Sequence, residues 1–118
     1  LQQIQIIKGW IDEEGTPREE VITVAGDPDS GATVDLDTCT PQGEGHRELC
    51  ALWTDPAFDP QRPAVYYGRA VETPSCRWSV RDCLSLPPEE RPSFCTDGSV
   101  PSVIQERAWT SPIWYDPP

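Results

Sequence analysis

The sequence predicts an all-β fold, an immunoglobulin- or fibronectin-like β sandwich of about seven short strands stapled by disulfides. Three observations carry this prediction. Apolar and β-branched residues alternate in short segments, clusters of Gly, Pro and Asp separate these segments, and no stretch has the period of a helix. Fourteen prolines and eight glycines among 118 residues also disfavour long helices. The length fits a single domain.

The longest strand pattern covers residues 63–78, PAVYYGRAVETPSCRW. At a period of two, bulky side chains such as Val65 and Tyr67 share one face, and mostly small ones share the other. This pattern indicates a strand that is packed on both sides. We expect it to pair antiparallel with residues 103–109, in a hairpin closed by a disulfide from Cys76.

The other predicted strands are short apolar runs bounded by turn residues. In chain order they cover residues 1–11, 20–25, 32–36, 49–53, 103–109 and 112–115. The first two are expected to form a hairpin. Residues 54–62 are expected to be irregular because two prolines remove backbone donors. We expect a short turn or strand at 80–86 and a loop at 87–101.

The charge balance narrows the classes of partner. Nine basic and 20 acidic residues give a net charge of −11, which repels nucleic-acid backbones and anionic membrane surfaces. No apolar stretch approaches the length that a membrane helix needs. The sequence therefore predicts neither a nucleic-acid partner nor a membrane span.

Five cysteines, without a CxxC pair and with one histidine, suit disulfides better than zinc. Disulfides indicate an oxidising compartment, so we expect a periplasmic or extracellular location. A bridge between Cys39 and Cys50 would close one turn, and a bridge between Cys76 and Cys95 would pin the long loop. Cys83 could replace either partner of the second bridge, and the sequence does not choose between these pairings. One thiol is left over.

Candidate chemical groups are few. His46 lies in a glycine-flanked turn, where a solvated loop residue is favoured over a catalytic base. Four acidic residues are candidate calcium ligands, but their spacing departs from the helix–loop–helix calcium pattern. A solvated acidic loop is therefore favoured. These four are Asp27, Asp29, Asp35 and Asp37. Because serine-nucleophile, zinc-protease and phosphate-loop motifs are absent, the sequence predicts no catalytic, cofactor-binding or metal-binding residue in this chain.

Tryptophan is abundant for this length, with five residues. Exposed indoles can stack on sugars, but a small core also needs large side chains, and core positions are favoured for most of them. They are Trp10, Trp53, Trp78, Trp109 and Trp114. We expect the guanidinium groups of Arg69, Arg77 and Arg107 to stack on Trp and to pair with the acidic surplus.

Five stretches spread along the chain carry a family resemblance: IQIIKGWID, TVDL, LCALWTDPAFDP, VYYGRAVETPSCRWS and IQERAWTSPIWY. In these stretches the chain resembles the C-terminal region of the bacterial domain-of-unknown-function 3604 family, in its cysteine-bearing branch. Members of that family look like metal-dependent hydrolases related to the polymerase and histidinol phosphatase (PHP) superfamily. The resemblance implies an upstream catalytic domain that holds a divalent metal, zinc or manganese, and acts on a phosphoester-type substrate.

We therefore expect residues 1–118 to be one noncatalytic C-terminal β domain of an exported hydrolase. A chain that begins at Leu1 and contains no methionine is expected to be a fragment of a larger precursor, with the upstream catalytic domain as its partner. The first alternative is an extracellular structural module that self-assembles as a homo-oligomer, through free β edges at 1–11 and 112–115 and the unpaired cysteine. The second alternative is a carbohydrate-binding module.

Overall fold

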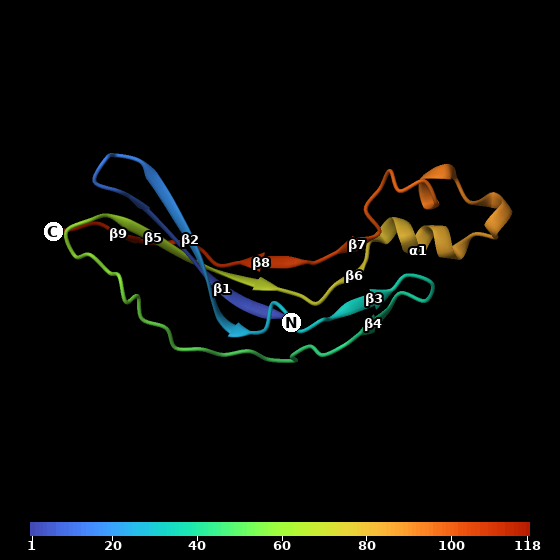
Figure 1. The fold of residues 1–118 in the computed structure, drawn as a ribbon, viewed down its shortest axis with the longest axis horizontal. Helices are drawn as coiled ribbons and strands as arrows, with labels where there is room; N and C mark the ends of the chain where they lie inside the picture. The colour runs from blue at the N-terminus through green and yellow to red at the C-terminus, as the bar shows by residue number, and fades with distance from the viewer.

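The structure, a computed structural model that describes residues 1–118, confirms a mostly β, antiparallel fold. It contains nine strands, one α-helix and two short 3-10 helices. The main sheet has the order β2 (Pro17–Gly26), β1 (Gln3–Ile11), β5 (Ala64–Val71) and β8 (Arg107–Trp109), and β9 (Ile113–Tyr115) pairs with β5 on the same edge as β8. Figure 1 shows β5 running between β1 and the two C-terminal strands.

The predicted hairpin at the N-terminus is confirmed as β1 and β2. Its turn is organised by Asp12, whose carboxylate oxygen Oδ1 accepts the backbone N–H groups of Glu14 and Thr16 at 2.9 and 2.8 Å. The hydrogen bond from Thr16, together with the guanidinium of Arg18, holds the pKa of Asp12 below its usual value. Gly15 takes a positive φ of 78°, which is the conformation that glycine adopts at little cost.

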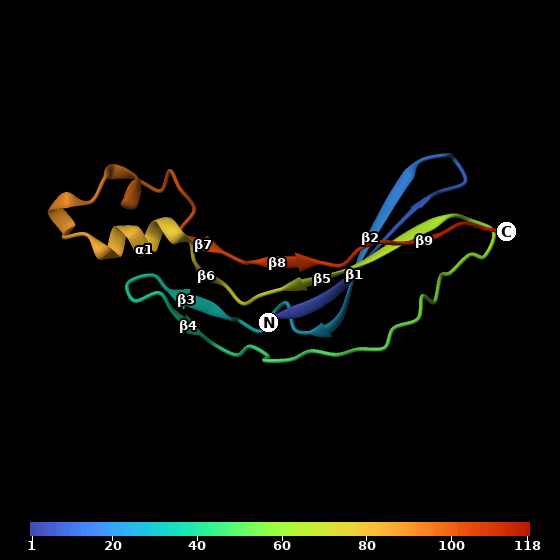
Figure 2. The ribbon, with the colours of Figure 1, turned by 180° about the vertical axis from the view of Figure 1, so that it is seen from behind.

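The main sheet has two faces that differ in what covers them. Strand register places Lys8 opposite Tyr66 on one face, and it places Ile7 between Tyr67 and Val21 on the other. The long segment of residues 43–63, which connects β4 to β5 without regular structure, runs along one side of the sheet (Figures 1 and 2). It contacts the face of Lys8 and Tyr66, here named the loop face. The face of Ile7 and Tyr67 is named the open face.

The second part of the molecule lies beyond the end of the main sheet (Figure 1). It consists of two small two-stranded sheets and the helices. These elements are β3 (Thr33–Asp35) with β4 (Thr40–Gln42), β6 (Ser75–Cys76) with β7 (Val103–Ile104), α1 (Trp78–Ser85), η1 (Pro88–Glu90) and η2 (Ser93–Cys95). Disulfides join Cys39 to Cys76 and Cys83 to Cys95, so this part is held by covalent bonds as well as by packing.

The molecule is elongated and has a small core. Its extents are 66 × 30 × 22 Å and its radius of gyration is 19.5 Å, whereas a compact domain of this length has about 13 Å. Ten of the 118 residues are buried, and Ile7 is the largest side chain that is fully enclosed. The immunoglobulin-like sandwich is not confirmed, because the strands form sheets of five, two and two strands. The main sheet therefore has no second layer of strands packed against it.

The central strand prediction is confirmed in its pairing. β5 pairs antiparallel with β8, which lies within the expected segment 103–109, and β6 pairs with β7 further along the same two segments. The predicted closure of this hairpin by Cys76 is wrong, because Cys76 bonds to Cys39 in the turn between β3 and β4. The Cys39–Cys50 and Cys76–Cys95 pairings are wrong for the same reason. Cys83 takes the place of Cys76 as the partner of Cys95, which is one of the pairings that the sequence left open. Cys50 is free and exposed. The cause is tertiary: β3 lies against β6, which brings Cys39 and Cys76 together.

Three further expectations about single elements are wrong. Residues 49–53 form no strand, and they lie in the long segment, away from the sheet's hydrogen bonds. Residues 1–11 do not provide a free edge, because β1 is paired on both sides by β2 and β5. Residues 80–86 fall largely in α1, since WSVRDCLS lacks Pro and Gly and can form one short helix. The expected edge at 112–115 is confirmed, because β9 pairs with β5 alone.

The core role expected for most tryptophans is also wrong. Trp78, Trp109 and Trp114 are 67%, 60% and 72% exposed, and only Trp10 and Trp53 are half-buried. Trp78 is the first residue of α1, and the main sheet provides no second layer for the other two indoles to enter. These two, Trp109 and Trp114, lie along β5, where any second layer of the main sheet would pack.

Leu52 offers a direct check of the correction at residues 49–53. Its side chain is 100% exposed, so replacing it with Ser is expected to change the free energy of unfolding by less than about 0.5 kcal/mol. Urea unfolding of the variant measures this, with Ile7→Ala as the buried comparison that must lower stability. If Leu52→Ser lowers the free energy of unfolding as much as Ile7→Ala does, residues 49–53 are buried as the sequence predicts.

Candidate functional site

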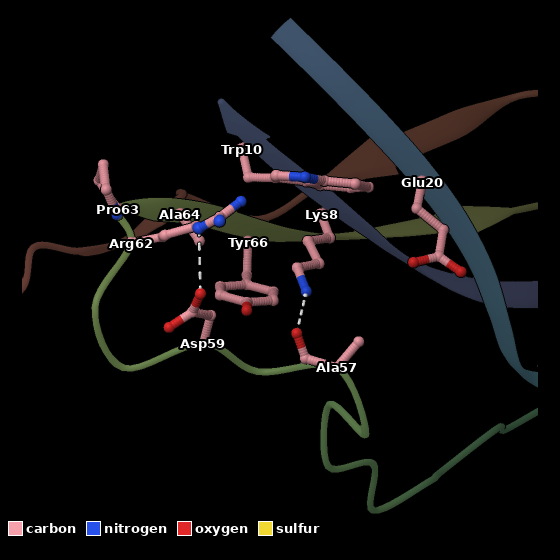
Figure 3. Close-up of a pocket in the computed structure, with 9 residues that line it drawn as sticks. All are labelled: Lys8, Trp10, Glu20, Ala57, Asp59, Arg62, Pro63, Ala64 and Tyr66. Carbon is pink, nitrogen blue, oxygen red and sulfur yellow. Dashed lines mark hydrogen bonds and ion pairs between the residues drawn. The ribbon is translucent and has the colours of Figure 1, made fainter. Parts of the chain in front are cut away.

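A cavity of about 230 Å³ lies between the loop face of the sheet and the end of the long segment 43–63. Nine residues line it, contributed by β1, β2, β5 and the long segment (Figure 3). In Figure 3 the side chains of Lys8 and Tyr66 project from the strands toward the segment that carries Ala57 and Asp59, and the indole of Trp10 extends across the strands beside Lys8. The cavity is therefore the place where the segment is attached to the sheet.

A buried ion pair forms the centre of this attachment. Lys8 Nζ lies 2.6 Å from Asp55 Oδ2, and both side chains are only 8% exposed. The same ammonium donates to the backbone carbonyl of Ala57 at 3.0 Å. It also lies 5.1 Å from the ring centre of Trp10 and 6.0 Å from that of Tyr66, within the range of cation–π attraction. The charge of Lys8 is thus neutralised by the carboxylate of Asp55 and stabilised further by the Ala57 carbonyl and two aromatic rings.

Asp55 and Tyr66 have shifted pKa values because they share this site. Tyr66 donates its hydroxyl to Asp55 Oδ2 at 2.7 Å, and the backbone N–H of Ala57 donates to Oδ1 at 2.8 Å. Burial by itself would raise the pKa of Asp55, but hydrogen bonds from Lys8, Tyr66 and Ala57 outweigh it, and the pKa lies below its usual value. Burial and the neighbouring Asp55 raise the pKa of Tyr66 to about 12. Near neutral pH Asp55 is therefore a carboxylate and Tyr66 a neutral phenol.

Aromatic contacts extend the attachment along the segment. Trp53 packs against Tyr66 with ring centres 6.3 Å apart, and Phe58 meets the edge of Tyr115 at 4.8 Å. The hydroxyl of Tyr115 donates to the carbonyl of Pro60 at 3.0 Å. These contacts join the segment to β5 and β9.

Arg62 closes the outer end of the site. Its guanidinium pairs with Asp59 at 3.0 Å and with Glu13 in the β1–β2 turn. The pair with Glu13 is largely solvated, since the Glu13 side chain is 82% exposed, and such pairs add little stability. Arg62 and Lys8 both line the cavity, and the buried pair of Lys8 with Asp55 lies next to it.

The arrangement is that of a structural clasp. The buried polar groups find partners within the chain, and no buried side-chain nitrogen or oxygen is left without one. A neutral phenol with a pKa of about 12 and a carboxylate stabilised by an ammonium are poorly tuned for proton transfer near pH 7. These contacts instead hold the irregular 21-residue segment 43–63 against the main sheet.

The titration of Tyr66 provides a test of the clasp. Because the fold favours its neutral phenol, the contribution to stability is complete below pH 10, the ordinary tyrosine pKa, and is lost as the pH rises through about 12. Ultraviolet absorbance of phenolate is expected to show one of the three tyrosines ionising near pH 12, and Tyr66→Phe is expected to remove that component. In Asp55→Asn the component should move to lower pH. An absorbance curve that is identical in Asp55→Asn would contradict the contact.

The sequence-based candidates lie elsewhere. The side chain of His46 is exposed, and its backbone exchanges hydrogen bonds with Leu1 at 2.7 and 2.8 Å. Asp27 and Asp35 accept backbone N–H groups within their own turns. Asp27, Asp29, Asp35 and Asp37 are not part of any group of three or more His, Cys, Asp or Glu side chains that could hold a metal ion.

The expected stacking of arginines on Trp is not observed. The cation–π contacts in the structure are made by Lys8, with Trp10 and Tyr66. Arg69, Arg77 and Arg107 take part in none of the four ion pairs. Sequence reasoning missed Lys8, Asp55 and Tyr66 as a cluster. One signal was present: Lys8 is the only lysine of the chain and stands in the middle of an apolar strand, where a lone charge needs a partner.

Comparison with protein families gives one match. Residues 1–117 match the family described as "Protein of unknown function (DUF3604)". No curated protein and no solved structure matches the chain. No helix of the structure has the length and apolar character needed to cross a membrane.

Proposed function

Because the chain belongs to the DUF3604 family, we propose that it is a noncatalytic β region of an exported metal-dependent hydrolase and supports a catalytic domain of the same protein. The observation that carries this proposal is the unfinished packing of the main sheet. A chain of 118 residues that buries ten of them leaves more apolar surface than an independent domain usually exposes. A neighbouring domain would cover that surface.

The chemistry of the proposed parent comes from the resemblance to PHP-type hydrolases and not from residues of this chain. A divalent metal, zinc or manganese, and a phosphoester-type substrate would belong to the catalytic domain. The two disulfides support export to the periplasm or the extracellular space. We also propose a sandwich architecture of the immunoglobulin or fibronectin type, in which the five-stranded sheet is one layer.

An activity comparison tests the proposal. The whole protein, supplied with zinc or manganese, is expected to hydrolyse a generic phosphomonoester such as p-nitrophenyl phosphate, and residues 1–118 alone are expected to be inactive. Hydrolysis by the isolated chain at the rate of the whole protein would overturn the assignment. A whole protein that is inactive toward phosphomonoesters and phosphodiesters would remove the hydrolase class.

Self-assembly is the second candidate, because β2 and β9 each present an unpaired edge and Cys50 is free and exposed. Light scattering with and without reductant separates this candidate from the first. A monomer under both conditions would count against it, whereas a reductant-sensitive dimer would favour it.

A further inference from the structure

The open face of the main sheet carries large apolar side chains that are exposed, although Ile7 and Val71 on the same face are buried. Register places Trp109 beside Arg69 and Trp114 beside Val65, so both indoles lie on the same face as Tyr67. They are 60% and 72% exposed and are separated by about 13 Å along β5, from a rise of about 3.3 Å per residue. Further aliphatic surface comes from β1 and β2. Ile11 and Val21 are 46% and 45% exposed.

The same face holds two arginines without a carboxylate partner. Arg69 lies on β5 and Arg107 on β8. Arg107 pairs with Val71, two residues after Arg69, so both arginines lie on the same face. A chain of hydrogen bonds orients Arg69: its Nε donates to Gln5 Oε1 at 2.7 Å, and Gln5 Nε2 donates to Gln3 Oε1 at 3.1 Å. Neither arginine forms an ion pair, although the chain has 20 acidic residues. These guanidinium groups are therefore free to meet carboxylates from outside.

One end of the open face is hollowed. A cavity of about 320 Å³ lies there, lined by Ile11, Pro17, Val65 and Trp114 of the open face and, around the end of the sheet, by Trp10, Ala64 and Tyr115 of the loop face. A depression of this size with mainly apolar walls can receive a large side chain from a partner. Protein interfaces concentrate their binding energy in such pockets near exposed Trp, Tyr and Arg.

We propose that the open face is the surface through which this chain docks on the catalytic domain of its own protein, against an apolar surface that places carboxylates opposite Arg69 and Arg107. This inference rests on the proposed function. Trp, Tyr and Arg together, with few Lys, Glu or Asp, form the composition that marks the centre of protein interfaces. Strands of this length and number offer several hundred Å² of flat surface, the scale of the roughly 800 Å² that a partner buries in a specific interface.

A second copy of the chain is a poorer occupant. A two-fold interface would bring the same patch of both copies together, so it would gather four unpaired guanidinium groups, Arg69 and Arg107 of each copy, in one interface. Each copy also carries a net charge of −11, which adds long-range repulsion. Complementary charge requires a different surface, and an acidic, apolar one fits.

The test starts from the whole protein with a specific protease site placed before residue 1 of this chain. After cleavage, the two parts are expected to stay together, and dilution followed by size-exclusion chromatography gives their dissociation constant. Trp109→Ala, Trp114→Ala and Arg107→Glu are each expected to raise that constant at least about 10-fold, as hot-spot residues do. Hydrogen exchange of residues 107–115 should be slower in the complex than in the separated chain.

Matched controls separate docking from folding. Ile113 is 71% exposed and adjoins Trp114, but its register partner Tyr66 places it on the loop face. Arg81 is an exposed arginine on α1, away from the main sheet. Ile113→Ala and Arg81→Glu are expected to leave the dissociation constant within about twofold. Circular dichroism of every separated variant should match that of the wild type.

The outcomes distinguish this surface from the proposed function. If the parts stay together and the open-face variants bind like the controls, the docking surface is wrong and the supporting role stands. If the gene encodes no catalytic domain with this chain, the supporting role fails. If the indoles remain open in the whole protein and their fluorescence is quenched by neutral or acidic oligosaccharides, the face is a glycan site and the docking proposal is overturned.

Discussion

Replacing Asp55 with Ala is expected to lower the free energy of unfolding by about 3–5 kcal/mol, the usual cost of removing one partner of a buried ion pair. The Lys8 side chain is 8% exposed and would keep only the Ala57 carbonyl and two aromatic ring faces as partners. Desolvation of the ammonium would then no longer be offset by the carboxylate. Urea unfolding followed by circular dichroism measures the loss.

Two further variants test whether the loss of stability in Asp55→Ala comes from the burial of the ion pair. Glu13→Ala removes a solvated carboxylate from Arg62 and is expected to cost less than about 1 kcal/mol. The double variant Lys8→Met, Asp55→Leu removes both charges, and it is expected to recover most of the loss because an apolar pair can replace a buried ion pair. Equal losses in Asp55→Ala and Glu13→Ala would show that the Lys8–Asp55 pair is not buried in solution.

The clasp also controls the mobility of the long segment. In Asp55→Ala, backbone amides of residues 43–63 are expected to exchange with solvent faster, while those of β1 and β5 stay protected by the sheet. The pKa of Asp55 is depressed in the fold, so its contribution is present above the unfolded value of about 3.9 and is lost as the pH falls through the folded value. Acid should therefore release the segment, and it should do so less in the double variant.

Removing the Cys39–Cys76 disulfide, by replacing both cysteines with Ala, is expected to cost about 4 kcal/mol, against about 3 kcal/mol for Cys83–Cys95. The difference arises from chain entropy, because the two bridges span 37 and 12 residues. The first bridge also joins the β3–β4 hairpin to β6, and the two have no hydrogen-bonded ladder between them. Guanidinium unfolding under non-reducing conditions measures both losses.

The free cysteine supplies the control for the disulfides. Cys50 is exposed and unpaired, so Cys50→Ser is expected to change stability by less than about 0.5 kcal/mol. Peptide mapping without reductant should recover Cys50 as a thiol. A destabilisation by Cys50→Ser comparable to that of the Cys39 and Cys76 variant would mean that the bridges are differently paired.

Local patterns predicted those elements whose partners are close in sequence or whose alternation is long. The β1–β2 hairpin and β5 follow from β-branched alternation and the polar turn that contains Gly15. The pairing of β5 with residues 107–109 also follows, because residues 103–109 form the long alternating segment that comes after β5 in the chain. The run at 49–53 misled because a short apolar segment looks the same whether it enters a sheet or passes over one. The clasp was missed because Lys8 and Asp55 are 47 positions apart, and no local pattern connects them.

What the sequence determined by itself is the β class, the acidic surface, the presence of disulfides and the central position of residues 64–71, because period, charge and cysteine number are properties of composition and local order. Tertiary structure decided the rest. Cys39 meets Cys76 because β3 lies against β6, and Lys8 meets Asp55 because the long segment crosses one face of the sheet. The other face stays open because the chain forms one main sheet and no second layer, so Trp109 and Trp114 are left at the surface.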